Sequence, residues 1–137
     1  MTYDSTSLSA TGRWGMVSSE NYGQFLLAMG VGMIQRNLLE KQKPTIIIQI
    51  NDGVWTIQTE TALKSTESRF KLGEEYYEET EDGRKALCVG TIEDDKLVIA
   101  RRFGDETSTI TSEFHPEEMK QVYTAKGITS TRIFKRL

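Results

Sequence analysis

The stretch that decides the fold of this 137-residue chain is Thr45-Ile-Ile-Ile-Gln-Ile50-Asn-Asp-Gly53-Val-Trp-Thr-Ile-Gln-Thr59. Two short runs rich in β-branched residues flank Asn51-Asp52-Gly53, and such residues favour strands. The Asp-Gly pair tolerates the positive φ angles that a tight hairpin turn requires. The stretch therefore predicts two antiparallel strands, residues 45–50 and 54–59, joined by a tight turn.

The same pattern continues to the C-terminus. Alternating or β-branched runs are broken by turn residues at intervals of roughly ten residues, which is typical of an all-β sandwich or barrel. The further predicted strands span residues 64–72, 75–80, 85–92, 96–102, 106–114, 118–124 and 128–136, with another beginning near Gly12. A meander of this length is expected to close on itself, because closure removes exposed strand edges.

Two short helices are predicted between the first strand and Pro44. They span residues 21–28 and 33–39, and Ser18, Ser19 and Asn21 are available to cap the first. The predicted fold is therefore all-β, a ten-stranded antiparallel up-and-down β-barrel with a helix-turn-helix lid after the first strand. Residues 1–10 are rich in serine and threonine and are predicted to form a flexible extension, which leaves residues 11–137 as the barrel domain.

Composition narrows the class of protein. A chain of 137 residues is one domain in size, and its net charge of −3 argues against a general nucleic-acid binder. Cys88 is the only cysteine, and the first residues lack the apolar core of a signal peptide, so a reducing, cytoplasmic setting is expected. The longest apolar runs are too short to cross a bilayer.

Arg132 lies in the last predicted strand. Successive side chains of a strand point to opposite faces, so Arg132 shares one face with Ile128, Ser130 and Phe134. If that face is outside, Arg132 is a solvated surface charge, as most arginines are. If it is inside, the guanidinium must find an anion or hydrogen-bonding neighbours. The strand by itself leaves both readings open.

Six segments along the chain carry a family resemblance. They are Gly12-Arg-Trp14-Gly-Met-Val-Ser-Ser-Glu20-Asn21-Tyr22-Gly-Gln-Phe25-Leu26, Gly30-Val-Gly32, Lys43-Pro44-Thr-Ile-Ile, Thr59-Glu60, Phe70-Lys-Leu-Gly73-Glu-Glu75 and Thr131-Arg132-Ile-Phe134. In this order and spacing they resemble the intracellular fatty-acid-binding proteins of the calycin superfamily. The resemblance implies a β-clam with the helix pair as a lid over a water-containing cavity. It also implies reversible binding of a long-chain fatty acid or a related lipid, without chemistry.

The resemblance implies a head-group site that this chain matches only in part. Members of the family hold the carboxylate with two arginines and a tyrosine, whereas this chain has Phe134 for the tyrosine and Ser112 for the other arginine. Family register turns Gln121 and Tyr123 inward, where they would replace the missing donors. The predicted head-group residues are Arg132, Tyr123, Gln121, Ser112 and Phe134. The alternative is that these are ordinary interior residues, with Arg132 satisfied by water, Gln121 and backbone carbonyls.

Alignment with the family also predicts contacts for the ligand tail and the portal. These residues are Tyr22, Leu26, Met29, Val31, Leu63, Asp82 and Arg84. The alternative for the apolar residues is plain packing of the helices on the barrel, and for Asp82 and Arg84 it is an ordinary turn. The neighbouring acidic cluster is interpreted as a solvated face, too dispersed for a metal site. It comprises Glu74, Glu75, Glu78, Glu79, Glu81 and Asp82.

The predicted function is an intracellular carrier of long-chain fatty acids, with the carboxylate near Arg132 and the tail toward the lid. One alternative is a carrier of a retinoid, a bile-salt-like molecule or a neutral lipid. Another is a structural or membrane-associating barrel. An enzyme is not expected, because His115 and Cys88 belong to no catalytic motif, and no cofactor or metal is predicted. A monomer is expected, with transient membrane contact through the lid.

Overall fold

The computed structural model describes residues 9–137, so most of the predicted flexible extension lies outside the described residues. Within residues 9–137 the chain forms ten strands, with two helices after the first, as predicted. The strands are β1 (Gly12–Glu20), β2 (Thr45–Asn51), β3 (Val54–Glu60), β4 (Ser65–Lys71), β5 (Glu75–Glu79), β6 (Lys85–Glu93), β7 (Lys96–Phe103), β8 (Glu106–Phe114), β9 (Glu118–Ala125) and β10 (Ile128–Arg136). The helices are α2 (Tyr22–Ala28) and α3 (Met33–Glu40).

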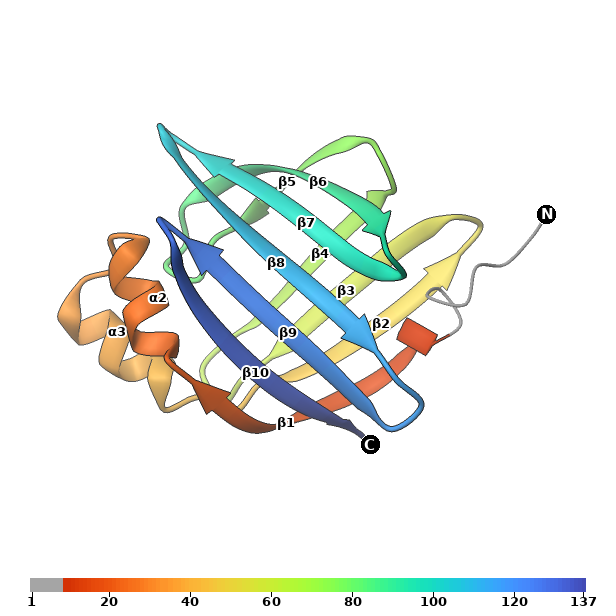
Figure 1. Ribbon diagram of the computed structural model, residues 1–137, viewed down its shortest axis with the longest axis horizontal. Coiled ribbons are helices and arrows are strands. Elements are labelled where there is room, and N and C mark those ends of the chain that lie inside the picture. The colour runs from red at the N-terminus through yellow and green to blue at the C-terminus, as the bar shows by residue number, and fades with distance from the viewer. Residues whose placement is uncertain (1–8) are drawn as a thin grey trace.

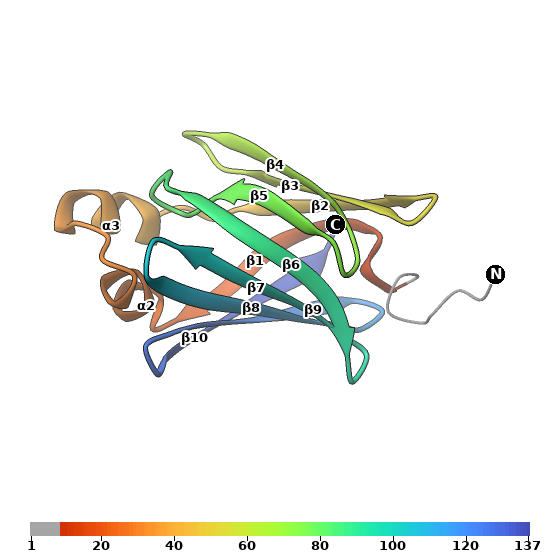
Figure 2. The same cartoon turned by 90° about the horizontal axis from the view of Figure 1, so that it is seen from above.

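The strands form one antiparallel meander that curls into a nearly closed barrel. Their order in the sheet is β4-β3-β2-β1-β10-β9-β8-β7-β6-β5, so β1 pairs with both β2 and β10. The helix pair sits together at one end of the barrel, beside the ends of β9 and β10 (Figure 1, Figure 2). The predicted fold class is confirmed, and β4 and β5 are left as the two edges of the sheet.

The β2–β3 hairpin has the predicted two-residue turn. Asn51 pairs with Val54, and Asp52 and Gly53 both adopt positive φ angles, 52° and 78°. This is the backbone that suits the right-handed twist of the flanking strands. Trp55, at the start of β3, is buried, so the hairpin turns an apolar face to the barrel interior.

The first helix packs its apolar face on the barrel. Tyr22, Phe25 and Leu26 of α2 are all buried. Asn21 occupies the N-cap position, but no side chain there makes a capping hydrogen bond, so the predicted capping is wrong. The Asn21 side chain instead donates to the Thr129 carbonyl of β10 at 3.0 Å. The residue that begins the helix thereby ties it to the last strand.

The far end of the barrel is fastened around Trp14. The Trp14 indole is fully buried and donates to the Ala10 carbonyl at 3.0 Å. Arg136 stacks over the Trp14 ring at 4.2 Å and donates to the carbonyls of Ser9 and Thr11. A Cβ at Gly12 would lie 2.4 Å from the Arg136 guanidinium, so this arrangement requires glycine. The start of the barrel domain and its last strand are thus joined.

Side chains close the seam between the edge strands β4 and β5. Phe70 stacks on Tyr76 with ring centroids 4.6 Å apart, and Ser68 donates to Glu78 at 3.2 Å. Phe70 also reaches β6, where a Cβ at Gly90 would meet its ring at 2.8 Å. Between β4 and β5, ring packing replaces the backbone hydrogen bonds that join the paired strands.

Candidate functional site

Arg132 points into the barrel and keeps one hydrogen-bonding group unused. Its residue is only 3% exposed, and its guanidinium lies over the Tyr22 ring at 3.8 Å. The Nε atom donates to the Ser19 hydroxyl at 3.2 Å. The Nη2 atom is buried and has no hydrogen-bond partner within residues 9–137. A buried charged donor without an acceptor is costly, so this atom marks a place where an anion would be stabilised.

Three buried polar side chains form a line beside Arg132. Tyr123 donates its hydroxyl hydrogen to the Gln121 amide oxygen, and the Gln121 amide nitrogen donates to the Ser112 hydroxyl at 3.0 Å. Gln121 lies on β9, where it is paired in register with Arg132 of β10 and with Ser112 of β8. Burial raises the pKa of Tyr123 more than the Arg132 charge lowers it, so the phenol stays protonated and keeps the hydrogen that it donates to Gln121.

The remaining predicted head-group and tail residues fall into two groups. Phe134 is fully buried two residues beyond Arg132, on the same interior face. The predicted apolar tail residues other than Leu63 belong to α2 and the turn after it and are buried: Tyr22, Leu26, Met29 and Val31. Leu63 lies apart from them, because it sits in the turn between β3 and β4 with 67% of its surface exposed.

Asp82 and Arg84 hold the C-terminal end of the lid helix. Arg84 donates to the Met29 carbonyl at 2.6 Å and to the Asp82 carboxylate at 2.9 Å. Burial raises the pKa of Asp82, but hydrogen bonds from Thr80 and Arg84 outweigh it and leave the pKa below its ordinary value. The turn between β5 and β6 is therefore attached to the point where α2 ends.

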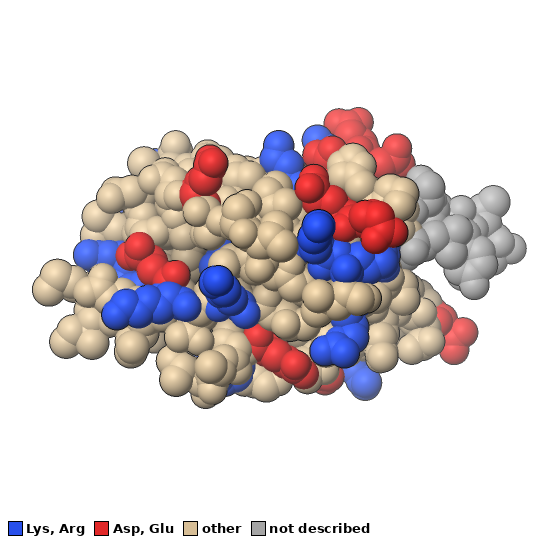
Figure 3. Space-filling view, turned by 90° about the horizontal axis from the view of Figure 1, so that it is seen from below, with Lys and Arg blue, Asp and Glu red and all other residues tan. Residues whose placement is uncertain are grey.

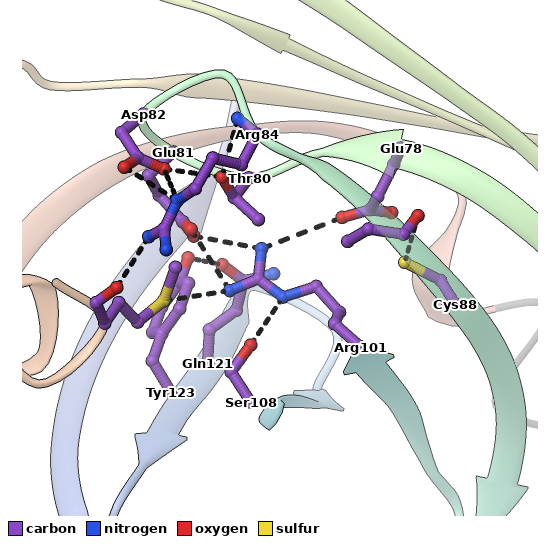
Figure 4. A network of polar contacts seen from close by, with 12 residues as sticks. Glu78, Thr80, Glu81, Asp82, Arg84, Cys88, Arg101, Ser108, Gln121 and Tyr123 are labelled. Carbon is purple, nitrogen blue, oxygen red and sulfur yellow. Dashed lines mark hydrogen bonds and ion pairs between the residues drawn. The ribbon is translucent and has the colours of Figure 1, made fainter. Parts of the chain in front are cut away.

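A second buried arginine, Arg101 of β7, was not predicted from the sequence. Its guanidinium makes a bidentate contact with the Glu81 carboxylate. Nη2 donates to one oxygen at 3.1 Å, and Nη1 donates to the other at 3.3 Å. Its Nε donates to Ser108 at 2.8 Å, and Glu78 lies 3.8 Å from Nη1 (Figure 4). Nη2 also contacts the Met29 sulfur at 3.5 Å. Arg101 is thus already saturated by the protein.

The interpretation of the acidic cluster as a solvated face is wrong for three of its members, of which Asp82 is mostly buried beside Arg84. The side chains of Glu78 and Glu81 are mostly buried against Arg101. Burial raises the pKa of Glu78, while Arg101 and hydrogen bonds from Tyr76 and Ser68 oppose that shift. Burial lowers the pKa of Arg101, but attraction to Glu81 and Glu78 outweighs it and raises the pKa. These three groups form an internal ion cluster.

Residues of the helix pair line a surface hollow that reaches the partners of Arg132. The hollow has a volume of about 490 Å³ and lies between α2, α3 and the end of β1. Ser19 and Tyr22, which both contact Arg132, are among its lining residues. These two side chains therefore separate the Arg132 guanidinium from the hollow.

Residues 9–137 form neither a reactive thiol site nor a metal site. Cys88 is buried, and burial raises the pKa of its thiol to about 12, so the thiol stays protonated at neutral pH. Among residues 9–137, no group of three or more His, Cys, Asp and Glu side chains is placed to hold a metal ion. In the same part of the chain, neither length nor apolar content allows any helix to span a membrane.

Comparison with known proteins gives consistent matches over the whole barrel. The model of the Lipocalin / cytosolic fatty-acid binding protein family matches residues 11–136. The chain is 36% identical over 125 residues to a fatty acid-binding protein of Tyrophagus putrescentiae, covering 91% of this chain and 95% of that protein. It is 33% identical over 126 residues to fatty acid-binding protein 9 of Homo sapiens, covering 92% and 96%.

A solved structure shows the same fold. The Schistosoma mansoni fatty acid binding protein in complex with arachidonic acid superposes with a TM-score of 0.92 at 28% identity. That match covers 96% of this chain and 98% of the other.

Proposed function

This chain belongs to the Lipocalin / cytosolic fatty-acid binding protein family, and on that premise we propose that it binds a long-chain fatty acid reversibly inside the barrel. The carboxylate meets Arg132, and the hydrocarbon tail runs toward α2. The protein acts as a cytoplasmic, monomeric carrier and performs no chemistry on its ligand. The relatives named as fatty acid-binding proteins, one of them solved with arachidonic acid, support this class of ligand.

The observation that carries the proposal is the unpartnered Arg132 Nη2 atom. A ligand carboxylate supplies the acceptor that residues 9–137 do not, and Tyr123 can donate to it only by releasing Gln121, which accepts its hydroxyl hydrogen. A charge-assisted hydrogen bond of this kind contributes roughly 1.5 to 3 kcal/mol. The tail contributes the larger share of affinity, at roughly 0.8 kcal/mol per buried methylene before the ordering costs.

A second candidate ligand is a retinoid, a bile-salt-like molecule or a neutral lipid. The line formed by Tyr123, Gln121 and Ser112 favours it, because these uncharged groups suit a hydroxyl as well as a carboxylate. Ser112 and Phe134 supply no second charge. The two candidates differ in whether the ligand carries a charge for Arg132.

We expect organic extraction of the purified protein, followed by mass spectrometry, to recover a fatty acid. A displacement titration then compares a fatty acid, its matching alcohol and a retinoid. The fatty acid is expected to bind saturably and at least about tenfold tighter than the alcohol, the size of one charge-assisted hydrogen bond. Preference for the retinoid or alcohol would favour the second candidate, and weak, nonsaturable uptake would favour a structural role.

We also propose that the lid makes transient membrane contact through apolar side chains. Leu27, Met33, Ile34 and Leu38 are exposed on α2 and α3, Ile34 by 79%. Basic and acidic side chains are interspersed on the face shown in Figure 3, so that face has no single-sign field to attract anionic lipid. We take the exposed apolar side chains of α2 and α3 to supply the attraction.

Replacing Met33 and Ile34 together with serine is expected to slow ligand transfer to vesicles several-fold without changing the Kd. Transfer should slow equally on neutral and anionic vesicles, because the lost contact is apolar. Val17→Ser is the matched control, since Val17 is an exposed apolar residue of β1. Unchanged transfer rates in the double variant would rule out this contact.

A further inference from the structure

The Glu81 carboxylate occupies the bidentate hydrogen-bonding edge of a second interior arginine, Arg101. Arg101 is 3% exposed and is the only other arginine buried within residues 9–137 besides Arg132. A bidentate guanidinium is the geometry by which proteins hold a ligand carboxylate. In this chain the two oxygens of Glu81 already fill that geometry, and Glu78 adds a second carboxylate at 3.8 Å. Within the described part of the chain, the protein thus supplies an anion to Arg101 and none to Arg132 Nη2.

The helix α2 sets the spacing between the two arginines. Arg132 contacts the Tyr22 ring at the first residue of α2, and Arg101 contacts the Met29 sulfur at its C-cap. Seven residues of helix rise by about 10 Å. Gln121 is paired in register with Arg132, and Figure 4 shows Gln121 and Tyr123 beside Arg101, so both arginines border one interior. The residues of α2 that contact Arg132 and Arg101 are therefore about 10 Å apart along the helix, and a ligand tail that ran from Arg132 along α2 would meet the Arg101 cluster at about that distance.

We propose that Glu81 makes this protein selective for lipids with a single acidic group. This inference rests on the proposed function, because it takes the first carboxylate to be held by Arg132. A second carboxylate about 10 Å away finds the Arg101 fork filled and meets the like charges of Glu81 and Glu78. A tail without a second charge suffers no such repulsion. Glu81 is a specificity-determining residue that acts by occupying Arg101.

The test compares straight-chain α,ω-dicarboxylic acids of increasing length with their half methyl esters, by calorimetric titration. In the unaltered protein each diacid is expected to bind at least about tenfold more weakly than its half ester, the size of one charged contact. Glu81→Gln removes the negative charge that Glu81 holds against the Arg101 guanidinium and is expected to remove most of that difference in affinity. The gain should be largest for the diacid that spans about 10 Å between carboxylates. Adding Arg101→Met to Glu81→Gln should abolish the gain.

Glu79→Gln is the matched control, because Glu79 is exposed on the neighbouring strand and pairs only with the surface residue Lys64 among described residues. The inference is overturned if the unaltered protein binds diacid and half ester equally, a comparison that needs no variant. It is also overturned if Glu81→Gln and Glu79→Gln show the same preference between diacid and half ester. The same holds if the gain in diacid affinity in Glu81→Gln does not depend on the length of the diacid. Tight binding of half esters with no diacid discrimination would overturn this inference while leaving the proposed function intact. Failure of monocarboxylates and half esters to bind would overturn both.

Discussion

Replacing Arg132 with alanine is expected to weaken the binding of a long-chain fatty acid by about 10- to 150-fold, which corresponds to roughly 1.5 to 3 kcal/mol. The buried Nη2 atom has no hydrogen-bond partner among residues 9–137, so within that part of the chain its hydrogen bond to the ligand is not offset by one that must be broken. The matching fatty alcohol should lose far less, because it carries no charge for the guanidinium. Parallel titrations of acid and alcohol measure the difference.

Two further variants separate charge from packing. Arg132→Met keeps most of the side-chain bulk over Tyr22. Like Arg132→Ala, it should weaken binding of the acid much more than binding of the alcohol. Arg102→Ala removes an exposed arginine of β7 and should leave both affinities unchanged. Equal losses for acid and alcohol in the Arg132 variants would mean that the residue packs the interior and does not hold the carboxylate.

Replacing Phe70 with alanine is expected to lower the free energy of unfolding by about 3 to 5 kcal/mol, the usual cost of truncating a buried phenylalanine. Phe70 is 4% exposed and stands between Trp55 and Tyr76, whose rings are stacked on it at 6.0 Å and 4.6 Å. It also fills the space above Gly90. Because β4 and β5 are the edges of the sheet, the loss of this ring opens the seam as well as a cavity.

Chemical denaturation measures the stability of this variant, and amide hydrogen exchange locates the change. Exchange should speed up first in β4 and β5, before β9 and β10. Tyr77→Ala is the control, because the Tyr77 side chain on β5 is 62% exposed and points away from the seam. A cost below about 1 kcal/mol, or one equal to that of the control, would show that ring packing does not close the seam.

Local sequence patterns predicted most of the fold for clear physical reasons. Strand boundaries follow from alternation and turn residues, both of which act over a few residues, and the Asp52-Gly53 turn formed as expected. Asn21 shows the limit of local reasoning. The sequence predicts that Asn21 caps the helix with its side chain. The folded chain brings the Thr129 carbonyl within reach, and the Asn21 side chain donates to that carbonyl instead.

The interior charges illustrate what alternation can and cannot reveal. The alternation that groups Arg132 with Ile128 and Phe134 also groups Arg101 with Leu97, Ile99 and Phe103, which are buried. That signal was present and was overlooked. The partner was harder to find, because Glu81 lies in a turn between strands and comes to Arg101 only when the barrel closes. A local run of acidic residues concealed that some of its members face inward.

The most direct test of the central claim is a crystal structure of the protein with a bound long-chain fatty acid. The account predicts a carboxylate oxygen about 3 Å from Arg132 Nη2, with the Arg101–Glu81 pair unbroken and the tail running along α2. A carboxylate bound at Arg101, or in the hollow between α2 and α3 with Arg132 Nη2 still unpartnered, would contradict it.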